Sequence, residues 1–129
     1  MVNFGPPESI PPQFAGRRFH RHNPRATLMR TTPAENRRLG EIFAAKLNAA
    51  RGPVTVMLPL AGFSAIDRAG EPFYDPEADT AFAEALTAQL APQVRVIRFD
   101  GHINDEAFAH TAADTLHAMI GAAGRGGTE

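Results

Sequence analysis

Four side chains in two polar stretches of this sequence have the types that hydrolytic or acid/base chemistry needs. Ser64 and Asp67 lie in the stretch GFSAID, and His102 and Asp105 lie in the stretch DGHINDE. A serine becomes a nucleophile when a histidine takes its proton and a carboxylate orients that histidine. Without the serine, His102 with Asp67 or Asp105 could still supply the acid/base groups of a hydrolase or lyase. These residues define the first candidate site.

The serine nucleophile is the weakest part of that hypothesis. The stretch around Ser64 lacks the second glycine of a nucleophile elbow, and no tight strand-to-helix turn is expected there. Hydrogen bonding within a loop is the more common use of such a serine. His102 follows Gly101 at the end of an apolar run, so a structural role in a capping loop is an equal alternative to acid/base chemistry.

The second candidate site is an anion site formed by Arg30, Thr31 and Thr32 in the stretch RTTPAEN. The free N–H groups and the dipole of a helix N-terminus attract anions, so a phosphate or carboxylate could bind there. Simple capping of the helix is the alternative. The sequence has no Walker lysine motif, no GxGxxG fingerprint and no ligand set with the spacing of a zinc site.

Three helices are expected to position these side chains. Each has a capping residue at its start, apolar residues at helical spacing, and a glycine or proline at its end. The first start is the clearest, because Thr32 and Glu35 form a capping box around Pro33. The expected helices are 33–51, the segment between Asp75-Pro76 and Pro92, and the segment from Asn104 or Asp105 to Gly121. The first helix is expected to bury Leu39, Ile42, Phe43, Leu47 and Ala50, and the third Phe108, Ala112, Leu116 and Met119.

Two apolar runs rich in β-branched residues, VTVMLPL at 54–60 and VRVIRF at 94–99, predict buried strands. Residues 17–22 and 26–30 are weaker strand candidates. The alternation of helix and strand predicts an α/β fold with right-handed crossovers between parallel strands. We therefore expect a small parallel sheet with flanking helices, which is an incomplete Rossmann-like (doubly wound) domain.

Both predicted buried strands lead into the polar stretches. In an open parallel sheet, ligands bind beyond the carboxyl ends of the strands. If the two strands are neighbours, Gly62, Ser64 and Asn104 join His102 around one crevice. The connection 60–75 has no secondary-structure pattern, and such long loops in small domains are usually functional or disordered. We expect it to form the wall or lid of a ligand site.

The composition is that of one folded domain. The 129 residues are 43% hydrophobic and 21% charged, which are ordinary values for globular proteins. No apolar run approaches the length of a membrane span, and the first residues do not resemble a secretory signal, so no membrane partner is expected. The absence of cysteine excludes a disulfide framework and fits a cytoplasmic location.

The distribution of proline and charge indicates how the chain is organised. Proline-rich residues 1–16 predict an extended arm, residues 17–120 an α/β domain, and residues 121–129 a flexible tail. Residues 1–51 hold nine basic against three acidic groups, a net charge of +6, whereas residues 52–129 hold four against eleven, a net charge of −7. Nucleic-acid binding is not expected, because the arginines are not interleaved with aromatic residues.

The strings HNPRATLMRTTPAEN, GPVTVMLPLAGFSAIDRAGEPFYDPEAD and GHINDEAFA together resemble the C-terminal domain of one family. It is the uncharacterised bacterial and fungal family related to the plant tobamovirus-resistance protein that binds ATP. The resemblance runs from about Val2 to Ile120 and implies the latter part of a Rossmann-like domain. It makes ATP a possible ligand of the family as a whole and assigns no ATP contact to a residue of this chain.

A partial domain of this kind implies a partner. Parallel strands are normally covered on both faces, and open sheet edges need cover as well. We therefore expect a homodimer, or a complex with a partner domain, in which residues 1–16 pack across the neighbour. The leading hypothesis is a component of such an assembly that binds a small anionic or phosphorylated ligand at the strand ends. The alternatives are the hydrolase or lyase described above and a structural assembly fragment without catalysis.

Overall fold

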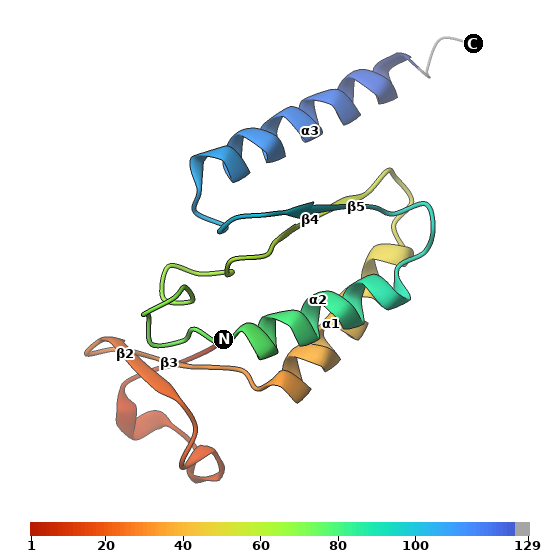
Figure 1. Ribbon diagram of the computed structural model, residues 1–129. Coiled ribbons are helices and arrows are strands. Elements are labelled where there is room, and N and C mark those ends of the chain that lie inside the picture. The colour runs from red at the N-terminus through yellow and green to blue at the C-terminus, as the bar shows by residue number, and fades with distance from the viewer. Residues whose placement is uncertain (126–129) are drawn as a thin grey trace.

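The two apolar runs pair side by side as parallel strands. In the computed structural model, which describes residues 1–125, β4 (Thr55–Pro59) and β5 (Arg95–Phe99) pair along their whole length. α1 (Pro33–Asn48) and α2 (Pro76–Gln89) lie on one face of this sheet, and α3 (Glu106–Arg125) lies on the other (Figure 1). The predicted α/β fold, a small parallel sheet with flanking helices, is confirmed.

The weaker strand candidates do not extend the parallel sheet. They form a separate antiparallel sheet in which β3 (Ala26–Met29) lies between β1 (Val2–Phe4) and β2 (Phe19–Asn23). Only a short turn at Pro24 and Arg25 joins β2 to β3, so the chain reverses direction between them. The expectation of a single thin sheet is corrected by this hairpin, because a short turn cannot connect parallel strands.

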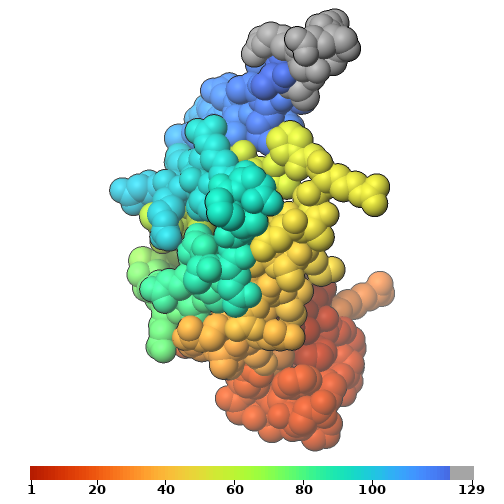
Figure 2. Space-filling view, turned by 90° about the vertical axis from the view of Figure 1, so that its right-hand side faces the viewer, coloured from red at the N-terminus to blue at the C-terminus, as the bar shows by residue number. Residues whose placement is uncertain are grey.

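The proline-rich segment 1–16 folds against its own chain. Its first residues are the edge strand β1, and its prolines lie at two short 3₁₀ helices, η1 (Pro7–Ser9) and η2 (Pro12–Phe14). The rings of Phe4 and Phe14 pack with their centroids 5.6 Å apart. With β2 and β3 this segment forms a lobe at one end of the molecule, and α3 lies at the other end (Figure 2).

The helix starts are those that the sequence predicted. The Thr32 hydroxyl accepts the Glu35 N–H over 3.2 Å, and the Glu35 carboxylate accepts the Thr32 N–H over 2.8 Å, which completes a capping box. Asp75 caps α2 by accepting the Ala78 N–H over 3.1 Å. These are short-range contacts, which is why local sequence signals located them correctly.

α1 packs against α2 mainly through small and polar residues. The apolar residues that helical spacing indicated contribute only partly, through Leu47 and through the contact of Phe43 with Phe82 of α2. The buried residues of α1 are Asn36, Gly40 and Ala44. Leu39 and Phe43 are 36% and 49% exposed, so their predicted burial was wrong. A Cβ on Gly40 would lie 2.6 Å from the carbonyl oxygen of Phe82, which shows how closely the two helices approach. A contact this close selects small residues rather than the largest apolar ones.

α3 covers the outer face of the parallel sheet mainly near its start. Phe108 packs edge-on against Phe99 of β5, with ring centroids 5.3 Å apart. Leu116 is 58% exposed, so its predicted burial was wrong. The helix continues beyond Gly121 to Arg125, and residues 126–129 of the expected flexible tail lie outside the described residues. No helix within residues 1–125 has the length and apolar character needed to span a membrane.

Candidate functional site

The connection 60–75 is a folded loop that links the two sheets. Its Phe73 is fully buried and donates its N–H to the Ile66 carbonyl over 2.9 Å. The His20 ring of β2 contacts Phe73 with ring centroids 6.2 Å apart, and Arg18 Nη1 donates to the Tyr74 carbonyl over 3.2 Å. The loop is therefore held by its own backbone hydrogen bond and by contacts from β2 and from Arg18 just before it, as a wall of a site would need.

Gly62 lies where the two polar stretches meet. Its carbonyl accepts the Ile103 N–H over 3.1 Å, so the GFSAID and HIND stretches lie side by side, as the strand-end rule indicated. Gly62 has a φ of 123°, which L side chains rarely adopt. A Cβ at this position would overlap the carbonyl oxygen of Asp67 and lie 3.0 Å from His102 Cδ2. Only glycine allows this close approach of the two loops.

His102 holds the two loops together through both of its ring nitrogens. Its Nε2 lies 2.9 Å from the Ser64 carbonyl oxygen, which can only accept, so Nε2 carries the proton. Its Nδ1 accepts the Asn104 N–H over 3.1 Å. These contacts select one neutral tautomer, and the side chain is only 3% exposed. The geometry therefore favours the structural alternative for His102 and gives Ser64 a backbone role.

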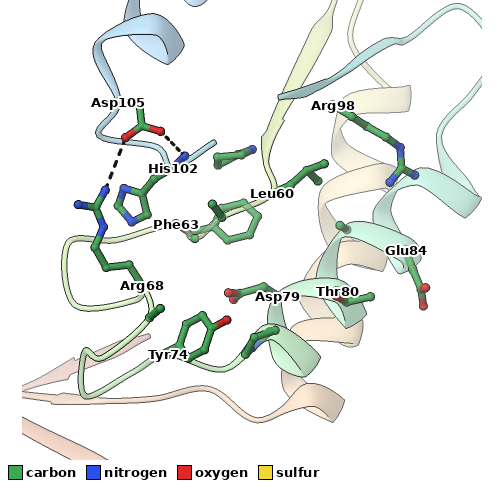
Figure 3. Close-up of a pocket in the computed structure, with 16 residues that line it drawn as sticks. Leu60, Phe63, Arg68, Tyr74, Asp79, Thr80, Glu84, Arg98, His102 and Asp105 are labelled. Atoms are coloured by element: carbon green, nitrogen blue, oxygen red, sulfur yellow. Dashed lines mark hydrogen bonds and ion pairs between the residues drawn. The ribbon is translucent and has the colours of Figure 1, made fainter. Parts of the chain in front are cut away.

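Asp105 fastens the turn that contains His102. Its Oδ2 accepts the His102 N–H over 2.7 Å, and its Oδ1 lies 3.6 Å from Arg68 Nη2 (Figure 3). The Asp105 side chain is 43% exposed. Of the three residues expected to do acid/base chemistry, Asp105 is therefore the one whose carboxylate remains open to solvent.

Arg30, Asp67 and Asp79 form a buried group of charges that we call the Arg30 cluster. Arg30 Nη2 lies 2.6 Å from Asp79 Oδ1 and 3.3 Å from Asp67 Oδ1. The side chains of Arg30, Asp67 and Asp79 are 7%, 1% and 15% exposed. Asp67 Oδ2 also accepts the Phe63 N–H over 3.1 Å. The cluster joins the end of β3 to the loop and to α2, which is a structural use of Arg30 and Asp67.

Asp79 is the member of the cluster with a perturbed proton affinity. Burial raises the pKa of its carboxyl from 3.8 to about 6, and the nearby negative charge of Asp67 contributes to the increase. The hydrogen bond and positive charge of Arg30 act in the opposite direction. Two carboxylates facing one guanidinium leave an excess negative charge, so proton binding is favoured.

The N-terminus of α1 is occupied by the protein's own side chains. The Glu35 carboxylate lies there in the capping box, where an external anion was expected. Arg17 binds this carboxylate through Nη1 at 3.0 Å and Nη2 at 2.6 Å, and that hydrogen bonding lowers the Glu35 pKa. The geometry therefore favours simple capping as the role of Thr32. Thr31 is buried beside it, and its hydroxyl has no hydrogen-bond partner within residues 1–125.

A cavity of about 520 Å³, which we call the main pocket, lies at the carboxyl ends of β4 and β5. The loop 60–75, the first turns of α2 and the end of β5 form its walls (Figure 3). Arg68 and Arg98 lie at opposite ends of the pocket in this view, and Tyr74 and Asp79 lie on its α2 side. Its volume is typical of small-molecule sites.

Of the predicted site residues, Gly62, His102 and Asp105 line the main pocket. The others do not line it and lie in the loop 60–75, in the Arg30 cluster, at the N-terminus of α1 or in the turn before α3: Arg30, Thr31, Thr32, Ser64, Asp67 and Asn104. Sequence reasoning missed Arg98 and Asp79. The strand-end rule pointed toward Arg98, whereas no local pattern marks Asp79, because its partner Arg30 is 49 positions away. Within residues 1–125, no group of three His, Asp or Glu side chains could hold a metal ion.

Comparison with known proteins identifies relatives of the chain over most of its length. Residues 1–120 match the model of the C-terminal domain of an uncharacterised protein family, UPF0261. A UPF0261 protein of Rhizobium meliloti (strain 1021) is 46% identical over 114 residues, which are 87% of this chain and 29% of that protein. A UPF0261 protein of Clostridium tetani is 41% identical over 121 residues, which are 93% of this chain and 30% of that protein.

A plant protein is similar to the same domain. The ToMV resistance protein Tm-1(GCR237) of Solanum lycopersicum is 44% identical over 120 residues, which are 90% of this chain and 16% of that protein. This chain thus spans less than a third of the bacterial relatives and less than a fifth of the tomato protein.

Proposed function

Because this chain belongs to the uncharacterised protein family UPF0261, as part of its C-terminal domain, we propose a function from its own pocket. The main pocket binds a small anionic or phosphorylated ligand, and the domain acts as a component of a larger assembly. The observation that carries this proposal is the position of Arg98, which has no acidic partner within residues 1–125, in a cavity at the strand carboxyl ends. Sites of this kind in α/β sheets are common ligand sites.

Two arginines supply the positive charge that an anion needs. Within residues 1–125, Arg98 pairs with no carboxylate. Arg68 is paired loosely, with its Nη2 at 3.6 Å from Asp105 Oδ1 and its side chain 49% exposed. Hydrogen bonds from arginine to phosphate or carboxylate are among the strong ones, because both groups are charged and their geometries match. The open arginine and the loosely paired one favour an anionic ligand at their own ends of the pocket, whose lining also includes the carboxyl groups of Asp79, Glu84 and Asp105.

Removing the Arg98 charge should weaken ligand binding. In Arg98→Gln we expect the Kd to rise by roughly tenfold to a hundredfold, the range for one lost charge-assisted hydrogen bond. The matched control is Arg95→Gln, at the other end of the same strand and outside the main pocket, which should bind as the wild type does. Thermal shift followed by calorimetry would measure this with inorganic phosphate, small carboxylic acids and ATP.

The outcomes of that experiment separate the candidate functions. ATP is included because of the family resemblance alone. An equal loss of ligand affinity in Arg98→Gln and Arg95→Gln would show that only the overall charge matters. That result would refute the main pocket as the ligand site. If no ligand raises the melting temperature, the structural assembly fragment without catalysis becomes the better hypothesis, since any ligand that binds the folded state stabilises it.

A hydrolase or lyase is the alternative function, and one observation favours it. Asp79 lines the main pocket, and its pKa of about 6 suits proton transfer near neutral pH. Both ring nitrogens of His102 and both carboxylate oxygens of Asp67 are engaged within the protein. In this alternative Asp79 would therefore act with Asp105 in place of the pairs that the sequence suggested.

We further propose that the domain assembles with a second copy or with a partner domain in the cytoplasm. Leu116 and Ile120 on α3 are 58% and 63% exposed, and burying them would stabilise a complex. Sedimentation at micromolar concentration should give a mass above that of one chain. In the double variant Leu116→Glu, Ile120→Glu the mass should fall to that of one chain. Leu39→Glu, on α1, is the control. A single monomeric species for the wild type would contradict a homodimer.

A further inference from the structure

One wall of the main pocket is apolar. Leu60, Phe63 and Tyr74 line the pocket together with smaller apolar residues of the loop 60–75 and of α2. Leu60 and Tyr74 are 50% and 46% exposed, although their side chains are large and mainly apolar. Large apolar side chains that are open to water within a cavity are typical of a site where a ligand covers them.

Leu60 lies close to Arg98 at the ends of the paired strands. Arg98 pairs with Leu58 in the register of β4 and β5, and paired residues of neighbouring strands point to the same face of the sheet. Leu60 follows Leu58 by two residues and donates its N–H to the Phe99 carbonyl over 2.9 Å, so the pairing continues past the end of β4. Each residue of a strand rises about 3.3 Å, so Leu60 lies about 7 Å beyond Arg98 along the strands.

Phe63 extends this apolar surface away from Arg98. Its ring contacts Phe82 of α2 edge to face, with ring centroids 5.7 Å apart, and this contact restricts its orientation. In Figure 3, Leu60 and Phe63 lie between the end of the pocket near Arg98 and the end near Arg68. A ligand that binds Arg98 with one end would therefore place its other end against Leu60 and Phe63.

The charges of the main pocket limit the charge of its ligand. The lining holds two arginines and three carboxyl groups: Arg68, Arg98, Asp79, Glu84 and Asp105. Arg68 faces Asp105, and Asp79 belongs to the Arg30 cluster, near which the Met1 ammonium also lies. Within residues 1–125, Arg98 and Glu84 form no ion pair. One open cation and one open carboxylate therefore remain, and the lining has no excess of positive charge.

This balance favours a carboxylate over a phosphate group. A phosphate group carries up to two negative charges near neutral pH, whereas a carboxylate carries one. Arg98 can form two parallel hydrogen bonds with a carboxylate and balance its single charge. A second negative charge would have no open arginine to pair with at this end of the pocket, where Glu84 would repel it.

We propose that the main pocket binds a carboxylic acid with an apolar body, which is an aromatic ring or a branched carbon chain. The carboxylate of this ligand binds Arg98, and its apolar body lies against Leu60 and Phe63. The inference rests on the proposed function, because it uses the same pocket and the same arginine. It narrows the ligand from any small anion to one class of acids.

Leu60→Asn is the variant that tests the apolar wall. Asparagine is close to leucine in size and replaces its apolar contact with an amide. Leu60 is half exposed, so this substitution should leave the fold intact. Leu39→Asn is the matched control, since Leu39 is also a partly exposed leucine and does not line the main pocket.

Calorimetry on the full chain would compare phenylacetate and isovalerate with acetate, gluconate, inorganic phosphate and the neutral compound phenylethanol. We expect phenylacetate or isovalerate to bind at least about tenfold more tightly than acetate, gluconate or phosphate, because its apolar body leaves water. Leu60→Asn should lose most of this gain, and Leu39→Asn should retain it. Arg98→Gln should weaken the binding of phenylacetate to about that of phenylethanol.

A measurement on the wild type tests the same contact without a variant. The methyl resonances of Leu60 should shift strongly with the apolar acid that binds more tightly and only slightly with phosphate. The enthalpy of binding of that acid should become more negative as temperature rises, because burial of apolar surface lowers the heat capacity. If the acid binds but the Leu60 resonances stay in place, the inference is overturned.

The outcomes separate this inference from the proposed function. If phosphate or gluconate binds through Arg98 as tightly as the apolar acids, or if the gain of the apolar acids survives Leu60→Asn, the inference is overturned and the proposed function stands. If phenylethanol binds as tightly as phenylacetate and Arg98→Gln changes neither, both are overturned, because the pocket then does not recognise an anion. Both are also overturned if no compound binds.

Discussion

Replacing Gly62 with alanine should destabilise the protein by about 3 kcal/mol or more, since backbone strain and overpacking each cost 1–3 kcal/mol. The backbone φ of 123° is unfavourable for any residue with a Cβ. The added methyl group would also overlap the Asp67 carbonyl and press against the His102 ring. The loop cannot move away easily, because Asp67 is bonded to Arg30 and His102 is bonded to the Ser64 carbonyl.

Gly70→Ala is the matched control for this prediction. Gly70 lies in the same loop with a φ of 90°, but apart from its chain neighbours no atom of the described residues lies within 4 Å of a Cβ built there. Its substitution should cost only the backbone strain, about 1 kcal/mol. Urea unfolding would measure both variants. Equal free energies of unfolding for Gly62→Ala and Gly70→Ala would show that the two polar stretches are not packed through Gly62.

Replacing Arg30 with methionine should cost about 3–5 kcal/mol at pH 8, the usual loss when one partner of a buried ion pair is removed. Asp67 and Asp79 would then face each other without the guanidinium that pairs with both, in a place where their side chains are only 1% and 15% exposed. Arg17→Met is the control. Its ion pair with Glu35 is more exposed, at 22% and 42%, and should contribute about 1 kcal/mol or less.

The raised pKa of Asp79 makes the free energy of unfolding depend on pH, in the wild type and in Arg30→Met. Between pH 3.8 and about 6 the folded protein binds a proton at Asp79 that the unfolded chain does not bind. The contribution of Asp79 to the free energy of unfolding therefore falls as pH rises through this window. Asp79→Asn should remove this part of the pH dependence. Arg30→Met should lose less free energy of unfolding at pH 5 than at pH 8. The reason is that protonation of Asp79 removes one of the two negative charges that Arg30 faces.

Unfolding measurements at pH 5 and pH 8 would check this prediction. If Arg30→Met loses the same free energy of unfolding at both pH values, the Arg30 cluster does not bind a proton in this range. An Asp79→Asn variant with the full pH dependence of the wild type would contradict the assignment of that dependence to Asp79.

Local signals in the sequence determined the helix starts, the two parallel strands and the edge of the sheet at which the main pocket lies. Thr32 and Asp75 act on N–H groups three residues away, so their capping roles follow from the sequence around them. The two apolar runs became paired parallel strands because a helix between them leaves room for that connection. The position of the main pocket followed from the strand ends, which any parallel sheet brings to one edge.

Only the tertiary structure decided which side chains face the main pocket and which are used inside the protein. Arg30 meets Asp67 and Asp79 across 37 and 49 positions, and no local pattern reports partners so far apart. The same holds for α1, where close contact with α2 selected Gly40 over the larger Leu39 and Phe43. Two residues expected at ligand or catalytic sites thus became a buried ion cluster, because a buried charge must be paired before it can serve anything else.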